Sequence, residues 1–225
     1  NNFDSLKEFV FQAQLKGYEP LEQPDRYVYE DFPWTKFSKK LSESKLSMIS
    51  TGGLFCKDDD PMDPPGMTQE EAIKNIGKIF RSPVILSSIP NNTLRQNLVI
   101  RQPGYDTRAA LIDPNVVFPY EILTKLKNNN LIKSVTDNFY SFVGACSQSN
   151  LIKKAAPQWV DLMISQKVDG VLLVPAWPVC HMSVGHVARI FENKGISTVT
   201  LLSKSFQHLA TQMNIPRVLI TNNYV

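Results

Sequence analysis

The stretch DGVLLVPAWPVCH, residues 169–181, shows most clearly how this chain is built. Its first half, up to Pro175, is an apolar run, which is typical of a strand buried on both faces of a sheet. A predicted helix over 183–193 follows, and Lys194-Gly195 supplies its stop. A buried strand that passes into a helix predicts a parallel sheet, whose sites lie at the carboxyl ends of the strands.

Strands and helices alternate on either side of this stretch, which predicts one α/β domain over residues 41–225. We expect a doubly wound, mostly parallel sheet of the flavodoxin/Rossmann-like kind, with helices on both faces. Thr68 and Glu71 have the spacing of a capping box, so a helix is expected to begin there. The predicted strands are 46–51, 98–100, 140–144, 197–202 and 218–221, and the other predicted helices are 68–80, 119–128, 151–166 and 206–213.

Residues 1–40 have a different character, and we interpret them as an aromatic N-terminal arm. A rough helical stripe comes first, and three prolines then break the chain among the aromatic residues of 27–37. Aromatic side chains on an irregular segment usually pack onto a surface. We therefore expect this arm to pack on the domain or on a partner chain.

The composition excludes several classes of protein. The 225 residues carry 24 basic and 21 acidic side chains with no basic cluster interleaved with aromatics, so no nucleic-acid partner is expected. No apolar run reaches the roughly 18 residues of a membrane span. The three cysteines are too few for a disulfide scaffold and suit a reducing compartment. With no signal-peptide pattern at the start, a cytoplasmic location is predicted.

Cys180 is the first candidate for chemistry, because it follows the buried strand where the helix begins. The helix dipole, and His181 if protonated, would favour its thiolate. The alternative is an inert buried cysteine, which is the commoner case. Cys180, His181 and His186 do not share one helical face, so no metal site is expected. Gly52-Gly53 lacks a nucleotide-binding glycine pattern, and no cofactor is predicted.

A second group of polar residues follows the predicted strand at 98–100. Tyr105, Asp106, Asp113 and Asn115 offer carboxylates, a phenol and an amide that could bind substrate or move a proton. Aspartates also cap turns and helices. We favour capping for Asp106 and function for Asp113 and Asn115. We interpret Cys56 and Cys146 as structural, although Cys56 could approach Cys180 if its loop folds over the edge of the sheet.

Five motifs make the chain resemble a known family, the selenoprotein B components of glycine, sarcosine, betaine and D-proline reductases. The resemblance spans about residues 34 to 221, with the motifs in matching order and spacing. It implies a cytoplasmic reductase subunit acting on a small amino acid or amine, with a reductase partner subunit or a second copy of itself. The motifs are PGYDTRAA (103–110), DPNVVFP (113–119), YSFVG (140–144), VPAWPVCHMSVG (174–185) and KGISTV (194–199).

The resemblance also implies a mechanism and its residues. A selenocysteine or cysteine attacks the activated substrate and splits a carbon–nitrogen bond, and a nearby thiol resolves the intermediate. Trp177 occupies the place of that nucleophile, Cys180 is the neighbouring thiol, and His181 supports the thiolate. The substrate-binding residues would be Gln102, Tyr105, Asp113 and Asn115, with Gln102 standing where the family pattern has a histidine.

Trp177 leaves three hypotheses for function. In the first, the chain is a reductase whose native residue 177 is selenocysteine or cysteine, since the selenocysteine codon UGA differs by one base from the tryptophan codon UGG. In the second, it is a non-catalytic binding or scaffold subunit in which Trp177 walls a pocket. In the third, Cys180 works with Cys56 or Cys146 in thiol transfer or redox sensing.

Overall fold

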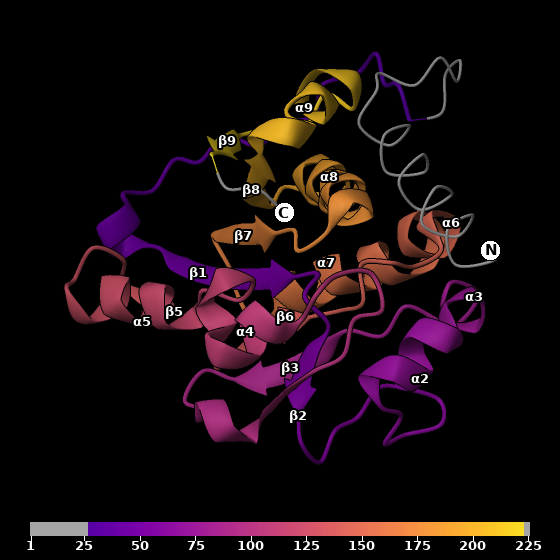
Figure 1. Ribbon diagram of the computed structural model, residues 1–225. Helices are drawn as coiled ribbons and strands as arrows, with labels where there is room; N and C mark the ends of the chain where they lie inside the picture. Colours follow the sequence, from indigo (N-terminus) through magenta and orange to yellow (C-terminus); the bar gives the residue numbers. More distant parts are fainter. Residues whose placement is uncertain (1–26, 223–225) are drawn as a thin grey trace.

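The computed structural model describes residues 27–222 and shows a mixed α/β fold around a mostly parallel sheet (Figure 1). The strands lie in the order β3-β6-β1-β7-β8-β9, and the short β5 also pairs with β1. Within the described residues of this sheet, β3 is the one strand that runs antiparallel to its neighbour. The strands are β1 (Lys45–Ser50), β3 (Ser87–Pro90), β5 (Ser134–Val135), β6 (Asn138–Ser141), β7 (Gly170–Val174), β8 (Ser197–Ser203) and β9 (Val218–Thr221).

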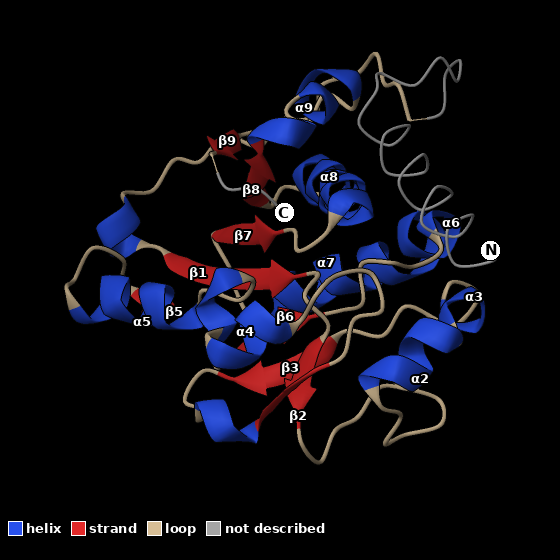
Figure 2. Cartoon of the chain, in the orientation of Figure 1, coloured by secondary structure: helices blue, strands red, loops and turns tan. Residues whose placement is uncertain are grey.

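Helices cover both faces of this sheet, as Figure 2 shows. Ile49 and Leu173 belong to a core that includes residues of α7 (Ala156–Ser165), α8 (Pro178–Asn193) and, at its rim, α9 (His208–Gln212). Their neighbours Met48 and Val174 belong to a second core, with α4 (Arg108–Ile112) and α5 (Tyr120–Asn128). Because alternate side chains of one strand enter different cores, the apolar run at 170–174 fits a strand buried on both faces.

The strand register brings three carboxyl ends to one level. Ser50 at the end of β1 pairs with Val174 of β7 on one side and with Ser141 of β6 on the other. The residues that follow these strands therefore meet at one edge of the sheet. That edge positions the candidate site.

Several predicted boundaries need correction. Helix α8 begins at Pro178 rather than 183, with Trp177 as its extended N-cap, because proline fits the first turn of a helix. Its stop is confirmed, since Gly195 has a φ of +85°. The predicted strand 140–144 is β6, which begins and ends earlier. The predicted helix 151–166 is a π-helical turn (Leu151–Ala155) followed by α7.

The other helices and a small second sheet complete the fold. The capping box of Thr68 and Glu71 is confirmed, but the helix predicted over 68–80 divides at Asn75 into α2 (Gln69–Lys74) and α3 (Ile76–Ile79). In the second sheet, β2 (Leu54–Cys56) pairs antiparallel with β4 (Leu98–Ile100). The short elements are η1 (Leu41–Glu43), η2 (Arg95–Asn97), η3 (Pro114–Val116), α6 (Gln148–Asn150) and η5 (Lys204–Phe206). Within residues 27–222, no helix has both the length and the apolar character of a membrane span.

The described part of the N-terminal region lies against the end of α8; residues 1–26 of the predicted arm lie outside the described residues. The Thr35 amide donates a 2.6 Å hydrogen bond to Oε2 of the fully buried Glu192. Arg217 pairs with Oε1 of Glu192, and its guanidinium lies 3.6 Å from the ring centre of Trp34. A buried ion pair therefore joins residues 34–35 to α8 and to the start of β9.

Candidate functional site

Thr51, the residue after β1, holds the segment that follows β7 in place. Its amide donates a 2.9 Å hydrogen bond to the Val174 carbonyl. Its hydroxyl oxygen Oγ1 accepts a 2.9 Å hydrogen bond from the Ala176 amide. The chain between β7 and α8 is thus tied to the end of β1. We did not single out Thr51 from the sequence, although a polar residue between a buried strand and Gly52-Gly53 is a usable signal.

Cys180 lies in the first turn of α8, underneath this junction, and is fully buried. Its Sγ is 4.0 Å from the Thr51 carbonyl oxygen and 4.0 Å from Nε2 of Gln102. Gly144 closes the third side, where a Cβ would lie only 2.5 Å from the sulfur. The thiol therefore fills a space lined by main-chain and amide groups.

Gln102, predicted to bind substrate, lies in this buried group. Its Nε2 donates to the Thr51 carbonyl at 2.9 Å, and its Oε1 accepts from the Gly104 amide at 3.3 Å. The side chain of Gln69, at the start of α2, bonds to both the amide and the carbonyl of Gln102. Both ends of the Gln102 amide are thus engaged with the main chain, so its place here is that of a positioning residue beside Cys180.

Trp177 lies above this group and faces an open cavity of about 650 Å³. Its indole packs against Gly104, where an added Cβ would lie 2.3 Å from the ring. Gln69, Tyr105 and Arg108 also line this cavity, which we call the outer cavity. The side chain at position 177 therefore faces open space, while Cys180 lies buried one turn further along α8.

A second cavity of about 310 Å³, the inner cavity, lies at the carboxyl ends of β7, β8 and β9. It shares Tyr105 and Asp106 with the outer cavity, and His181 and Ser203 are among its polar residues. The Tyr105 hydroxyl donates to the Gly52 carbonyl at 3.2 Å. Burial raises the pKa of Tyr105 well above its ordinary value, so the phenol stays protonated and can donate a hydrogen bond.

The predicted support for a Cys180 thiolate is wrong. Burial raises the pKa of Cys180 to about 11, even though hydrogen bonds to the sulfur act in the opposite direction. Burial also lowers the pKa of His181 to about 4. The His181 Nδ1–H donates to the Trp177 carbonyl at 2.9 Å, and Nε2 accepts from the Ser203 amide at 3.2 Å. His181 is therefore neutral, because desolvation outweighs the hydrogen bond to the Trp177 carbonyl, which would favour the protonated ring.

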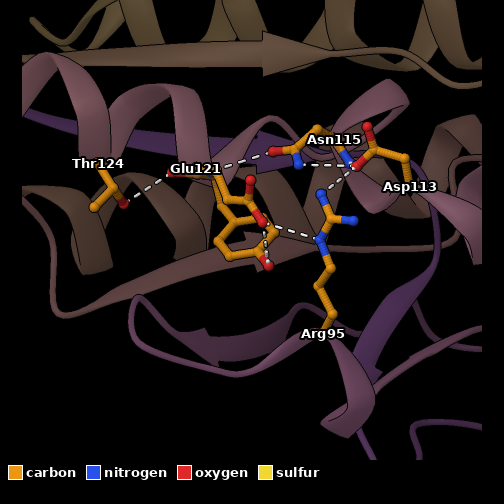
Figure 3. Close-up of polar contacts among 6 residues, drawn as sticks. Arg95, Asp113, Asn115, Glu121 and Thr124 are labelled. Atoms are coloured by element: carbon orange, nitrogen blue, oxygen red, sulfur yellow. Dashed lines mark hydrogen bonds and ion pairs between the residues drawn. The ribbon is translucent and has the colours of Figure 1, made fainter.

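Asp113 and Asn115 lie elsewhere, in an exposed cluster with Arg95 and Glu121 that Figure 3 shows. Asp113 accepts hydrogen bonds from the amide and the side chain of Asn115 at 3.1 and 2.9 Å and pairs with Arg95 at 2.9 Å. These hydrogen bonds, together with Arg95, lower the pKa of Asp113. Neither residue lines the outer or the inner cavity. Asp113 caps the short helix η3, which is the alternative that the sequence left open.

Asp106 has the local role that we favoured from the sequence. Its Oδ1 accepts a 3.0 Å hydrogen bond from the Arg108 amide, and its carboxylate pairs with the Arg108 guanidinium. Hydrogen bonds from Arg108 lower the pKa of Asp106 to about 2. This carboxylate is therefore charged at neutral pH at the edge of both cavities.

The three cysteines are free thiols in different surroundings. Cys56 ends β2, half-buried, with its sulfur 4.0 Å from Oγ1 of Thr93. Cys146 is buried beyond Gly144, close enough to Cys180 for the two thiols to interact electrostatically. Cys180 therefore interacts with Cys146, which lies two residues after the Gly144 that contacts its sulfur, whereas Cys56 lies against Thr93. In the part of the chain that the structure describes, no group of three His, Cys, Asp or Glu side chains could hold a metal ion.

Comparison with known proteins gives one family match. The family model described as glycine/sarcosine/betaine reductase selenoprotein B (GRDB) matches residues 28–176 and ends just before Trp177. The D-proline reductase subunit gamma of Acetoanaerobium sticklandii is 24% identical over 169 residues, which cover 75% of this chain and 63% of that protein.

Two relatives from Peptoclostridium acidaminophilum are similar over smaller shares of their own length. The betaine reductase complex component B subunit beta is 24% identical over 72% of this chain and 35% of the relative. The sarcosine reductase complex component B subunit beta is 22% identical over 88% of this chain and 41% of the relative. The chain thus spans less than two thirds of the length of these relatives. No solved structure matches the chain significantly.

Proposed function

Because the chain belongs to the glycine/sarcosine/betaine reductase selenoprotein B family, we propose that it is a subunit of a complex that reductively cleaves a carbon–nitrogen bond of a small amino acid or amine. Relatives named as components of betaine and sarcosine reductase complexes support a partner subunit. The free thiols favour a cytoplasmic location. We also propose that residues 41–225 form one domain and residues 1–40 an arm.

One observation carries the proposal: the side chain at position 177 faces the outer cavity at the point where the sheet reverses its winding. Apart from the short β5, the parallel strands numbered along the chain lie in the order 2-1-3-4-5, which supports a flavodoxin-like fold. In such sheets, ligands bind at the carboxyl ends of the strands on either side of the reversal, here β1 and β7. Residue 177 follows β7 and Thr51 follows β1.

The proposed chemistry needs a selenolate or thiolate at position 177. That atom attacks the substrate carbon, the carbon–nitrogen bond breaks, and the amine leaves with the electron pair and a proton. The Cys180 thiolate then attacks residue 177, which forms a selenenyl sulfide or a disulfide and releases the carbon fragment as a carbanion that takes up a proton. Substrate is reduced by two electrons and the pair 177–180 is oxidised.

The other residues of the site have supporting roles in this proposal. Gln102 and Thr51 position Cys180 through their contacts with its sulfur and with each other. The protonated Tyr105 donates a hydrogen bond to substrate in place of the Gly52 carbonyl. Asp113 and Asn115, proposed from the resemblance to bind substrate, gain no support from their place in the exposed cluster.

The identity of native residue 177 tests the proposal. We expect codon 177 of the source gene to be UGA or a cysteine codon, and protein isolated from that source to carry selenium or a thiol at this position. The result that contradicts a catalytic subunit is a UGG codon together with an intact mass that corresponds to tryptophan.

A non-catalytic binding subunit is the second candidate, and the fit of the indole against Gly104 favours it. In that case Trp177 walls the outer cavity and seals Cys180 beneath it. A stable complex with a partner subunit and no turnover would support this function. Thiol-dependent reductive cleavage of the carbon–nitrogen bond of glycine, sarcosine, betaine or D-proline by the purified chain would exclude it.

A further inference from the structure

Cys146 is a buried nucleophile that the proposed chemistry does not use, although it lies beside the thiol that does. We propose that Cys146 and Cys180 form a dithiol pair, in which Cys146 resolves an oxidised Cys180 and passes the oxidation to a thiol reductant. The first step of this relay, the oxidation of Cys180 by residue 177, rests on the proposed function. The pairing of the two cysteines is independent of that function and rests on their common contact with Gly144.

Gly144 and Ser183 connect the two cysteines. The amide of Cys146 donates a 2.9 Å hydrogen bond to the Gly144 carbonyl, and the Ser183 hydroxyl donates to the same carbonyl at 2.9 Å. Ser183 lies one turn after Cys180 on α8, so the Gly144 carbonyl connects the main chain of Cys146 with the helix that carries Cys180. Both cysteines are therefore attached to the same short stretch of main chain, Cys146 through its amide and Cys180 through its sulfur.

Gly144 contributes no side chain beside the sulfur of Cys180. Any Cβ on this residue would lie 2.5 Å from Sγ of Cys180 and 2.6 Å from Cβ of Thr51. A disulfide requires the two Cβ atoms to approach within about 4 Å. The missing side chain leaves the Cys180 sulfur in contact with the segment that carries Cys146.

The two cysteines differ in their access to solvent. Cys146 lines a third cavity of about 100 Å³, the cap cavity, which also touches Gly53, Met62 and Ser82. Cys180 does not line it and is completely enclosed. A reductant that enters the cap cavity therefore meets Cys146 first, whereas residue 177 faces the outer cavity, which shares no lining residue with the cap cavity.

The exchange balances in atoms and electrons. The Cys146 thiolate attacks Sγ of Cys180 in the 177–180 bond, a 146–180 disulfide forms, and residue 177 leaves as a selenolate or thiolate with the electron pair. A dithiol reductant then attacks Cys146, which restores both protein thiols and leaves the reductant as a disulfide. Two electrons pass from the reductant to residue 177.

The pKa of the attacking thiol limits the rate at which the pair is oxidised. Burial, reinforced by the neighbouring Cys180, raises the pKa of Cys146 to about 12. The thiolate is the attacking species, so oxidation of the resting pair is slow at neutral pH. As long as the pH stays below the pKa, the rate rises about tenfold for each unit by which the pH is increased. The pair is thereby protected from oxidants while no substrate is turning over.

Oxidation of the full chain by diamide, which converts two thiols to a disulfide, tests the pairing. After free thiols are blocked with N-ethylmaleimide, peptide mass spectrometry should find Cys146 cross-linked to Cys180, with a rate that rises from pH 7 to pH 9. Cys56→Ser should leave the cross-link unchanged. Cys146→Ala and Cys180→Ala should each abolish it, and circular dichroism checks that both variants are folded.

A folded chain in which diamide modifies Cys56 alone, or in which Cys146 and Cys180 react without joining, overturns the pairing. Trp177→Cys separates this result from the proposed function. In that variant a 177–180 disulfide should convert to the 146–180 disulfide, and Cys146→Ala should trap the first form. If the 146–180 bond forms but the 177–180 bond never does, the pairing stands and the assignment of position 177 is wrong.

Discussion

The surroundings of Cys180 and the exposed cluster around Arg95 differ in almost every physical respect, although both contain residues from the motifs that identify the family. Around Cys180, the polar groups of Thr51, Gln102 and His181 are buried and hydrogen-bonded to one another or to main chain. In the exposed cluster, Asp113 and Arg95 form an ion pair with both side chains about half exposed. Packing and buried hydrogen bonds hold the first region together, whereas solvent-exposed ion pairs hold the second.

This difference shows which motif residues are held in place by the structure around them. Water and salt weaken an ion pair at the surface, so its loss changes stability little. A buried hydrogen-bonding group has no water to replace a lost partner, so each member is costly to disturb. Changes around Cys180 should therefore have much larger effects than changes in the cluster around Arg95.

Gly144→Ala should have the largest effect. The new methyl group would lie 2.5 Å from Sγ of Cys180, so the main chain between β6 and α6 must shift. We expect the free energy of unfolding to fall by about 2 to 3 kcal/mol, the upper range for overpacking a core. Urea unfolding measures it. The control is Gly77→Ala, where a Cβ meets nothing within 4 Å. Equal stabilities of the two variants would show that the Cys180 region is loosely packed.

Acid should destabilise the buried region through His181, with an intermediate effect. Its pKa is lowered to about 4 in the folded protein by burial, whereas an unfolded histidine has a pKa near 6.5. Between these values the unfolded chain binds the extra proton, so stability is complete above about pH 6.5 and falls as the pH drops toward 4. The buried His186, with a pKa lowered to about 3, acts in the same direction.

We expect His181→Asn to reduce this dependence by about 1 kcal/mol per pH unit between pH 6.5 and 5, because one of the two buried histidines no longer titrates. Urea unfolding at pH 7, 6 and 5 provides the slopes. His208→Asn is the control, since that histidine is only partly buried. Parallel slopes for the His181 variant and the unchanged chain would mean that His181 is accessible to protons when folded.

Arg95→Gln should have the smallest effect. It removes ion pairs to Asp113 and Glu121 that lie at the surface, so the midpoint of urea unfolding should stay within experimental error of the unchanged chain at physiological salt. Arg108→Gln, which removes another exposed pair, is the matched control. A large loss of stability, or a change in the diamide reaction of Cys180, would connect the two regions and remove the contrast between them.

The sequence predicted the framework well where local pattern and tertiary packing agree. The strands at 170–174, 197–203 and 218–221 lie where apolar runs placed them, and the Thr68–Glu71 capping box begins a helix as expected. Pro178 is a start signal for α8, but we predicted the start of this helix five residues later, at 183. Strand β3 was not predicted, because Ser87–Pro90 has little strand pattern of its own and gains its place by pairing with β6.

The candidate site was harder to predict, because burial and not residue type decides it. Cys180 follows the strand as expected, but its pKa depends on enclosure by Thr51, Gln102 and Gly144, which come from three other parts of the chain. Asp113 and Asn115 follow Tyr105 closely in sequence, yet η3 turns them to the surface. The number of residues between two positions in the sequence therefore does not indicate how far Tyr105, or Asp113 and Asn115, lie from Cys180.

The ion pair between Glu192 and Arg217 has a consequence for biosynthesis. Glu192 is enclosed completely, and the cation that neutralises it is supplied 25 residues later in the chain. A nascent chain that has not reached Arg217 would bury an unpaired carboxylate if it packed α8 against β8, which costs several kcal/mol. We therefore expect incomplete chains to stay open to proteases in this region until synthesis has passed Arg217.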